Sequence, residues 1–197
     1  MADGRVITGF SNPYVALYAT TTSTSGVVVT YSSGQALARG VQLQIEPGSG
    51  SDNKFYANNI VAEDAGSTFS NGTATITVDG LKAAARKLVF GLPTADSSGW
   101  VKYGNSQSVP FLGFGCIVRY MEDGATTYEP LILPKIKMNT PSTDAATQEE
   151  EIDFQTEELT AQIYRDDTDD QNWKWEGTAQ TTEALADAAI KAALNIS

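Results

Sequence analysis

The segment from Val41 to Phe90 constrains the fold most, because much of it has the period-two pattern of β-strands. Between Val41 and Glu46, apolar residues alternate one for one with polar residues, which predicts a half-buried strand. The residues that follow, PGSGSDN, are turn formers and cannot extend that strand. Lys54–Val61 is then expected to return as the partner strand, so that the two form a hairpin with a long exposed tip.

A third strand and a helix are predicted in the rest of this segment. Thr73–Val78 (TATITV) is rich in β-branched residues, which pack well on a pleated sheet. Asp79 is a preferred N-cap residue and predicts a short helix over Leu81–Phe90, ended by Gly91 and Pro93. One stripe of this helix is apolar and is expected to cover one face of a sheet. The stripe consists of Leu81, Ala85 and Leu88.

The remaining chain adds further strands and a second helix. A strand over Val6–Tyr18 is interrupted at Asn12–Pro13, and Pro134 interrupts a later one, because proline cannot donate to a ladder and favours a bulge or an edge. The other predicted strands are Val27–Tyr31, Phe111–Tyr120, Tyr128–Met138 and Leu159–Tyr164, and the middle two form a hairpin around Glu122–Gly124. A terminal helix is predicted from an N-cap at Thr182 to about Leu194. Its apolar side is expected to be Leu185, Ala189, Ala192 and Ile196.

Strands that do not alternate one for one with helices favour an antiparallel β-sandwich or barrel over βαβ units. The predicted fold class is therefore mainly β, with one short flanking helix and a C-terminal helix. A chain of 197 residues fits one domain. We expect a β domain over residues 1–176 and a C-terminal helical arm over residues 177–197, which must dock on its own domain or on a neighbouring subunit.

Composition excludes several classes of protein. With 41% hydrophobic and 19% charged residues, the chain is not of the disordered type. A net charge of −11 argues against binding nucleic acid by phosphate neutralisation and against an anionic membrane surface. No apolar run approaches the roughly 18 residues of a membrane helix. The start, MADGRVITGF, lacks the pattern of a secretory signal, so we expect a protein kept in a cytoplasm or released without Sec export.

The residues predict no catalytic, cofactor-binding or metal-binding site. The chain has no histidine, which excludes Ser-His-Asp and Cys-His systems. Counted from Asp167, the positions at which a calcium loop needs Gly and Glu hold Asn172 and Thr178. A carboxylate pair is the remaining catalytic option, but among 24 acidic residues some pairing is expected by chance. The single cysteine, Cys116, lies in an apolar run and is expected to be a buried strand residue.

The order of these segments resembles a known family. It is similar to the order in the major tail protein of long-tailed, non-contractile bacteriophages. The segments are, in turn, a strand, the hairpin EPGSGSDNKFYANN, the acidic turn Ala62–Asp64, a strand, DGL and a short helix. The strand pair within Phe111–Met138 and the acidic segment Glu149–Asp166 are also similar to that family. The resemblance extends from Val6 to about Trp175 and rests on the order and spacing of several weak motifs.

The resemblance implies a structural virion protein with the tail tube fold, which is also that of type VI secretion tubes. Its subunits would form hexameric rings that stack into the hollow tail conduit for DNA ejection. The implied partners are further copies of the chain, a tape-measure protein, baseplate or distal tail proteins and a tail terminator, with double-stranded DNA passing through without specific binding. No enzyme activity, cofactor or membrane is implied. The protein would be located in the virion tail and assembled in the host bacterial cytoplasm.

Two sets of residues are candidates for tube functions. Because a conduit should not bind its cargo, a neutral to negative lumen is expected. The lumen-facing candidates are Gln42, Gln44, Glu46, Tyr56 and Asn58, with Glu149–Glu158 as the alternative source of negative charge; Lys135 and Lys137 oppose the idea if they also face inward. The family resemblance makes the hairpin tip a contact with the next ring. This predicted ring-stacking loop consists of Pro47, Gly48, Ser49, Gly50, Ser51, Asp52 and Asn53. The two chain ends are further candidates for contacts between rings.

Two other functions fit the sequence. One is a non-enzymatic β-sandwich that recognises a carbohydrate or a receptor, in which Trp100, Trp173, Trp175 and the tyrosines would stack on sugars. The other is the tube of a contractile injection device, which has a similar fold but a different cargo.

Overall fold

A computed structural model describes residues 4–24, 26–50, 54–57, 60–64, 68–105, 107–140 and 155–196. Within these ranges the chain forms ten strands and two helices. In chain order they are β1 (Val6–Ser23), β2 (Gly26–Ala36), β3 (Gly40–Ser49), β4 (Lys54–Ala57), β5 (Ile60–Asp64), β6 (Phe69–Val78), α1 (Ala83–Phe90), β7 (Phe111–Glu122), β8 (Ala125–Met138), β9 (Glu157–Tyr164), β10 (Trp175–Glu176) and α2 (Glu183–Ala193).

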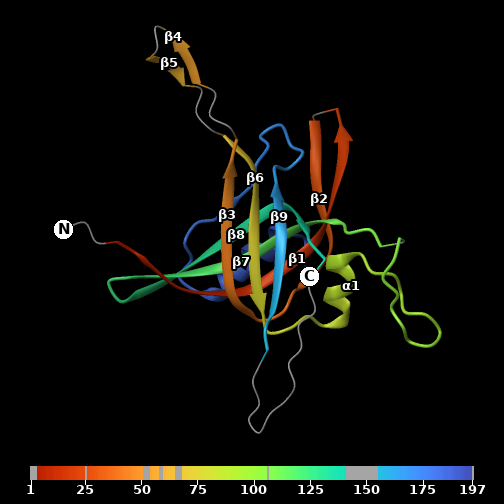
Figure 1. The fold of residues 1–197 in the computed structure, drawn as a ribbon. Helices are drawn as coiled ribbons and strands as arrows, with labels where there is room; N and C mark the ends of the chain where they lie inside the picture. The colour runs from red at the N-terminus through yellow and green to blue at the C-terminus, as the bar shows by residue number, and fades with distance from the viewer. Residues whose placement is uncertain are drawn as a thin grey trace.

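Eight of these strands form one antiparallel sheet that is not closed. The order is β2-β1-β7-β8-β9-β6-β3, and the short strand β10 pairs with β8. In Figure 1, β3, β6 and β9 run across β1, β7 and β8 at a large angle, so the sheet folds over itself into two layers. This arrangement confirms the prediction of a mainly β, antiparallel sandwich with flanking helices.

The main core lies between the two layers and is built from alternate residues of the strands. β7 contributes Leu112, Phe114 and Cys116, and the opposite layer contributes residues such as Ile76 and Leu159, all almost fully buried. Cys116 is therefore a core residue, as expected. Helix α1 adds Val89 and Phe90 to the same cluster, in which Leu43 and Ile45 of β3 are partly buried.

Helix α2 covers the outer face of the β1–β7–β8 layer. Its predicted N-cap is confirmed, since the Thr182 side chain accepts a hydrogen bond from the Leu185 backbone N–H. Of the predicted apolar side only Ile196 packs against the sheet; Ala186, Ile190 and Leu194 are the buried residues, and Leu185 is 52% exposed. The reason lies in β7, where Gly113 and Gly115 leave room for Ile190 and Leu194.

The predicted hairpin between Val41–Glu46 and Lys54–Val61 is wrong. β3 pairs with β6, and Leu43 lies opposite Ile76 while Ile45 lies opposite Ala74. This pairing places apolar residues of both strands on the core side, since paired residues share a face. β4 and β5 pair only with each other in a separate two-stranded sheet. Figure 1 shows this hairpin standing away from the main sheet, beyond the ends of β3 and β6.

The start of α1 also differs from the prediction. The N-cap is Lys82, and no side chain caps this end of the helix. Asp79 instead accepts hydrogen bonds from the backbone N–H and the guanidinium of Arg39, and the Arg39 side chain is the main cause that lowers the pKa of Asp79. The predicted end is confirmed, because Gly91 has a left-handed φ of 58°. The most buried residues of α1 are Ala85, Val89 and Phe90, not the predicted stripe as a whole.

Both proline interruptions are confirmed as bulges. The register between β1 and β7 shifts between Ser11 and Tyr14, and Asn12 has a φ of 49°. The register between β7 and β8 shifts at Leu112–Phe114, opposite Pro134. Neither helix of the described chain is long and apolar enough to cross a membrane.

Candidate functional site

The outer surface of β3, β6 and β9 is a polar sheet face that no described helix or strand covers; it is called the polar face below. In the central part of each strand, apolar residues face the core and polar residues alternate with them on this side. In Figure 1 these three strands form the front layer, while the other layer lies behind them. The polar face consists of Gln42, Gln44 and Glu46 of β3, Thr73, Thr75 and Thr77 of β6, and Glu158, Thr160 and Gln162 of β9.

The strand register arranges these residues in three rows. Gln42 lies opposite Thr77, which lies opposite Glu158. The next two rows are Gln44–Thr75–Thr160 and Glu46–Thr73–Gln162. The three β3 residues and Glu158 are exposed, and the other members are half-buried by their neighbours in the sheet. A flat surface made of amides, hydroxyls and a few charges can stay hydrated without a covering layer.

Two lysines of β8 continue this face. Lys137 lies opposite Gln162 and therefore extends the third row, and Lys135 lies opposite Tyr164 on the same side of the strand. The Lys135 ammonium lies 2.8 and 2.7 Å from the two carboxylate oxygens of Asp167, and this contact lowers the pKa of Asp167. Its charge is thus neutralised locally. The remaining charges on the polar face are the carboxylates of Glu46 and Glu158 and the ammonium of Lys137. The net charge of the face is therefore slightly negative.

The structure brings three of the five lumen candidates together. Gln42, Gln44 and Glu46 share the polar face, and the Gln44 amide donates to the Glu46 carboxylate over 2.7 Å. The backbone of Tyr56 belongs to β4 in the separate hairpin, so it does not continue these rows. Asn58 lies outside the described residues, as does the 149–154 part of the alternative acidic segment. Glu157 of that segment binds Arg86 of α1 at 2.7 and 2.8 Å.

The predicted ring-stacking loop begins later in the chain than expected. Pro47, Gly48 and Ser49 are strand residues of β3, paired with Gly72, Asn71 and Phe69 of β6. Gly50 continues the contact through a 2.9 Å hydrogen bond from its N–H to the carbonyl of Thr68. Ser51, Asp52 and Asn53 lie outside the described residues.

The sheet ends in two open edges. Among the strands that the structure describes, β2 and β3 each pair on one side only. β3 spans ten residues and keeps a bulge at Val41, where the register to β6 shifts. The outward N–H and C=O groups of such an edge are available for pairing with another strand.

Sequence reasoning missed the largest part of the polar face. The threonines of β6 alternate with buried Ala74, Ile76 and Val78, and this alternation was visible in TATITV. Thr160 and Gln162 alternate in the same way within β9. Which of these strands lie side by side was not visible, because β6 and β9 are separated by α1, β7 and β8 in the chain.

The other chemically suggestive groups have structural partners. Asp166 is buried, and its Oδ1 accepts from the Thr168 N–H, the Thr168 hydroxyl and the Asn172 N–H, which closes the acidic turn. Its Oδ2 is buried without a hydrogen-bond partner among the described residues. Within the described chain, no three His, Cys, Asp or Glu residues gather to hold a metal ion. Burial raises the pKa of the Cys116 thiol, which disfavours the reactive thiolate.

The three tryptophans do not form a common binding platform. Trp173 stacks on Phe69 with ring centroids 4.4 Å apart and packs against the main core. Trp175 packs against the cluster under α2, and Trp100 is 71% exposed in the connection after α1.

No protein-family model and no curated protein matches this sequence.

Proposed function

We propose that this chain is a tail tube subunit of a long-tailed, non-contractile bacteriophage, whose copies form hexameric rings that stack into the hollow tail. The observation that carries the proposal is a polar sheet face bounded by the open edge of β3. Such a face fits the wall of a water-filled conduit, where it needs no covering layer. The order of segments that resembles major tail proteins supports the same function.

The open edge of β3 supports assembly around a ring. A long unpaired edge strand is a liability for an isolated domain, because other chains can pair with it without limit. When the edge of each copy pairs with the next copy around a closed ring, the liability disappears. Ring closure therefore gives the unpaired backbone of β3 a partner within a defined assembly.

The dimensions of the polar face fit a DNA conduit. The face comprises β3, β6, β9 and the C-terminal end of β8. If six copies each place these four strands around a common bore, about 24 strands at about 4.8 Å per strand would surround a bore roughly 37 Å across at the backbone. Such a bore is wide enough for a DNA double helix with its hydration.

The charge of the polar face fits passage rather than binding. Proteins that hold DNA neutralise several phosphates with lysine and arginine and release counterions. The polar face carries the negative charges of Glu46 and Glu158 and the positive charge of Lys137, while Lys135 is bound to Asp167. We expect such a lining to let DNA slide without being arrested.

Growth along the tail axis would be a second, open-ended association. The β4–β5 hairpin, which stands away from the sheet, is suited to reach a neighbouring ring. An open-ended stack needs other proteins to start it, set its length and stop it. Baseplate or distal tail proteins, a tape-measure protein and a tail terminator would fill these roles, and assembly would take place in the bacterial cytoplasm before the tube becomes part of the virion.

Electron microscopy and sedimentation of the purified protein test the proposal. We expect annular particles or tubes, whose proportion rises with protein concentration because each ring joins several copies. A protein that stays monomeric at high concentration, alone and with the companion tail proteins, would contradict the proposal. A monomer that binds sugars on a glycan array would instead indicate the carbohydrate-binding function. Tubes found inside a contractile sheath would indicate an injection device.

A further inference from the structure

The turn between β7 and β8, together with the start of β1, forms a projecting tongue with exposed apolar side chains. We define this tongue by Val6, Ile7, Met121, Glu122 and Asp123. Val6 and Ile7 are 60% and 67% exposed, and Met121 is 40% exposed. Val6 lies opposite Met121 in the ladder, so their side chains share one face of the tongue. The two carboxylates of Glu122 and Asp123 stand at its tip.

The tongue is held in place by its own contacts. Asp123 and Gly124 form a two-residue turn with φ values of 47° and 79°, the geometry that tight hairpins favour. Arg5 lies 4.1 Å from the centre of the Tyr120 ring and also pairs with Glu129 of β8. The apolar residues are therefore presented by paired strands, and docking would require little ordering of the chain.

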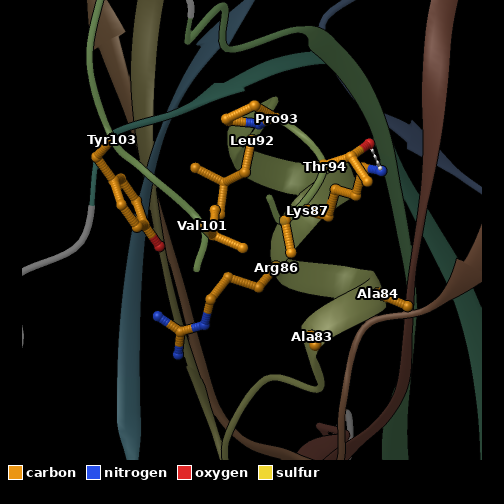
Figure 2. A pocket seen from close by; sticks show the side chains of 10 residues that line it. Ala83, Ala84, Arg86, Lys87, Leu92, Pro93, Thr94, Val101 and Tyr103 are labelled. Atoms are coloured by element: carbon orange, nitrogen blue, oxygen red, sulfur yellow. Dashed lines mark hydrogen bonds between the residues drawn. The ribbon is translucent and has the colours of Figure 1, made fainter. Parts of the chain in front are cut away.

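A groove of complementary character lies beside α1. A cavity of about 410 Å³ separates the helix from the connection that follows it, and Figure 2 shows Leu92, Val101 and Tyr103 facing the helix across it. Ala83 and Ala84 are exposed on the helix side, where their small side chains allow close approach of another chain. We call this cavity and its lining the α1 groove.

The rim of the α1 groove is basic. Arg86 and Lys87 both line it. Arg86 is paired with Glu157, but Lys87 donates to the Thr94 hydroxyl over 2.9 Å, a neutral partner, and has no ion pair among the described residues. An acidic, apolar tip and a basic, apolar groove are complementary in both respects.

We propose that the tongue of one copy seats in the α1 groove of the next copy around the ring. Figure 1 shows the β7–β8 turn and the start of β1 on one side of the molecule, and α1 with its following connection on the opposite side. One copy can therefore use both surfaces at once, which is the head-to-tail geometry that closes a ring. This inference rests on the ring assembly proposed above and names the residues that would join neighbouring copies.

Variants of exposed tongue residues test the inference without touching the core. Val6→Ser with Met121→Ser removes the apolar contact on the face that these two residues share, and Leu185→Ser on α2 is the matched control, since Leu185 is 52% exposed and lies outside the tongue and away from the sheet edges. We expect the double variant to need at least about tenfold more protein to form rings, and the control to assemble like the wild type. The readouts are sedimentation and electron microscopy, with circular dichroism to verify the fold.

Charge reversal tests whether the two surfaces meet each other. We expect Glu122→Lys alone and Lys87→Glu alone each to reduce ring formation, because each places like charges together, and the combined variant to restore it. If wild-type rings form and all these variants assemble equally well, the ring stands and the tongue–groove contact is wrong. If the single variants lose rings and the combined variant does not regain them, the pairing is also wrong. If the wild type forms no rings, both the inference and the proposed function fail.

Discussion

Gly91 shows how one residue can decide where an element ends. Its φ of 58° lies in the left-handed region, and a side-chain Cβ at this position would overlap the carbonyl oxygen of Ser108. The sequence predicted a glycine in the left-handed conformation here, because glycine commonly ends helices in this way. It could not reveal the close approach of Ser108, because the long connection after α1 brings that residue next to Gly91.

Alanine at Gly91 should therefore destabilise the protein more than alanine at Gly99. Both glycines have positive φ, but a Cβ at Gly99 meets nothing within 4 Å. We expect Gly99→Ala to cost about 1 to 2 kcal/mol for the backbone conformation alone, and Gly91→Ala about 1 to 3 kcal/mol more for the overlap. Urea unfolding of the two variants measures the difference. Equal midpoints would contradict the close approach to Ser108.

Other single residues were predictable only where the pattern was local. The alternation of Val41–Glu46 correctly predicted that Gln42, Gln44 and Glu46 share the exposed side of a strand. Asp79 was assigned as a helix cap because it precedes an apolar run. Its actual partner, Arg39, lies 40 positions earlier in the chain, and no local rule selects that contact over capping.

At the scale of elements, α2 belongs to the same packed structure as the sheet. Ala186, Ile190 and Leu194 cover Tyr14, Tyr31 and Ile117, which are otherwise on the outer face of their layer. The ends of α2 were predictable from its cap, but its buried side was not. In an alanine-rich helix several faces are weakly apolar, and the glycines of β7 select the one that fits.

Asp187 fastens α2 to β1, and this contact should depend on pH. Its carboxylate accepts from the Tyr14 hydroxyl at 2.8 Å and pairs with Lys191 at 2.8 Å. Burial acts to raise the pKa of Asp187, but these two partners outweigh it and lower the pKa below the usual value. The stabilisation is therefore complete above the unfolded-state pKa of about 3.9 and is lost as the pH falls through the lower folded-state value.

We expect Asp187→Asn to cost about 1 to 2 kcal/mol of unfolding free energy at pH 7. The difference from the wild type should shrink as the pH is lowered below about 4, where the wild-type carboxylate is also protonated. Urea unfolding at a series of pH values measures this. Asp170→Asn, in the exposed part of the acidic turn, is the control. A cost that stays constant down to the lowest pH would contradict a role for the charge.

At the scale of the whole molecule, two strand pairings determine the polar face. The sequence predicted a mainly β fold and several strands, but it joined β3 to the next strand in the chain. The structure instead pairs β3 with β6 and β6 with β9. Neighbours in sequence are the default expectation for antiparallel strands, and the inserted β4–β5 hairpin, which pairs only with itself, breaks that rule here.

If the polar face lines a conduit, added lysines on it should trap DNA. We expect assembled wild-type tubes to leave short duplex DNA free, and tubes of the Gln42→Lys, Gln44→Lys variant to retain it with an affinity that falls steeply with salt. Thr20→Lys with Thr22→Lys adds the same charge to exposed positions of β1, away from the face. Retention can be measured by co-sedimentation. Equal retention by both lysine variants would contradict the assignment of the polar face to the bore.

The junction at Gly50 and Thr68 has a practical consequence. The 2.9 Å hydrogen bond between their backbones joins the two ends of the insertion directly where β3 meets β6. An epitope or a fluorophore-labelling sequence placed between them would accordingly leave the pairing of β3 with β6 unchanged, and would report whether ring contacts need the β4–β5 hairpin. This position offers a natural cloning site for decorating the protein.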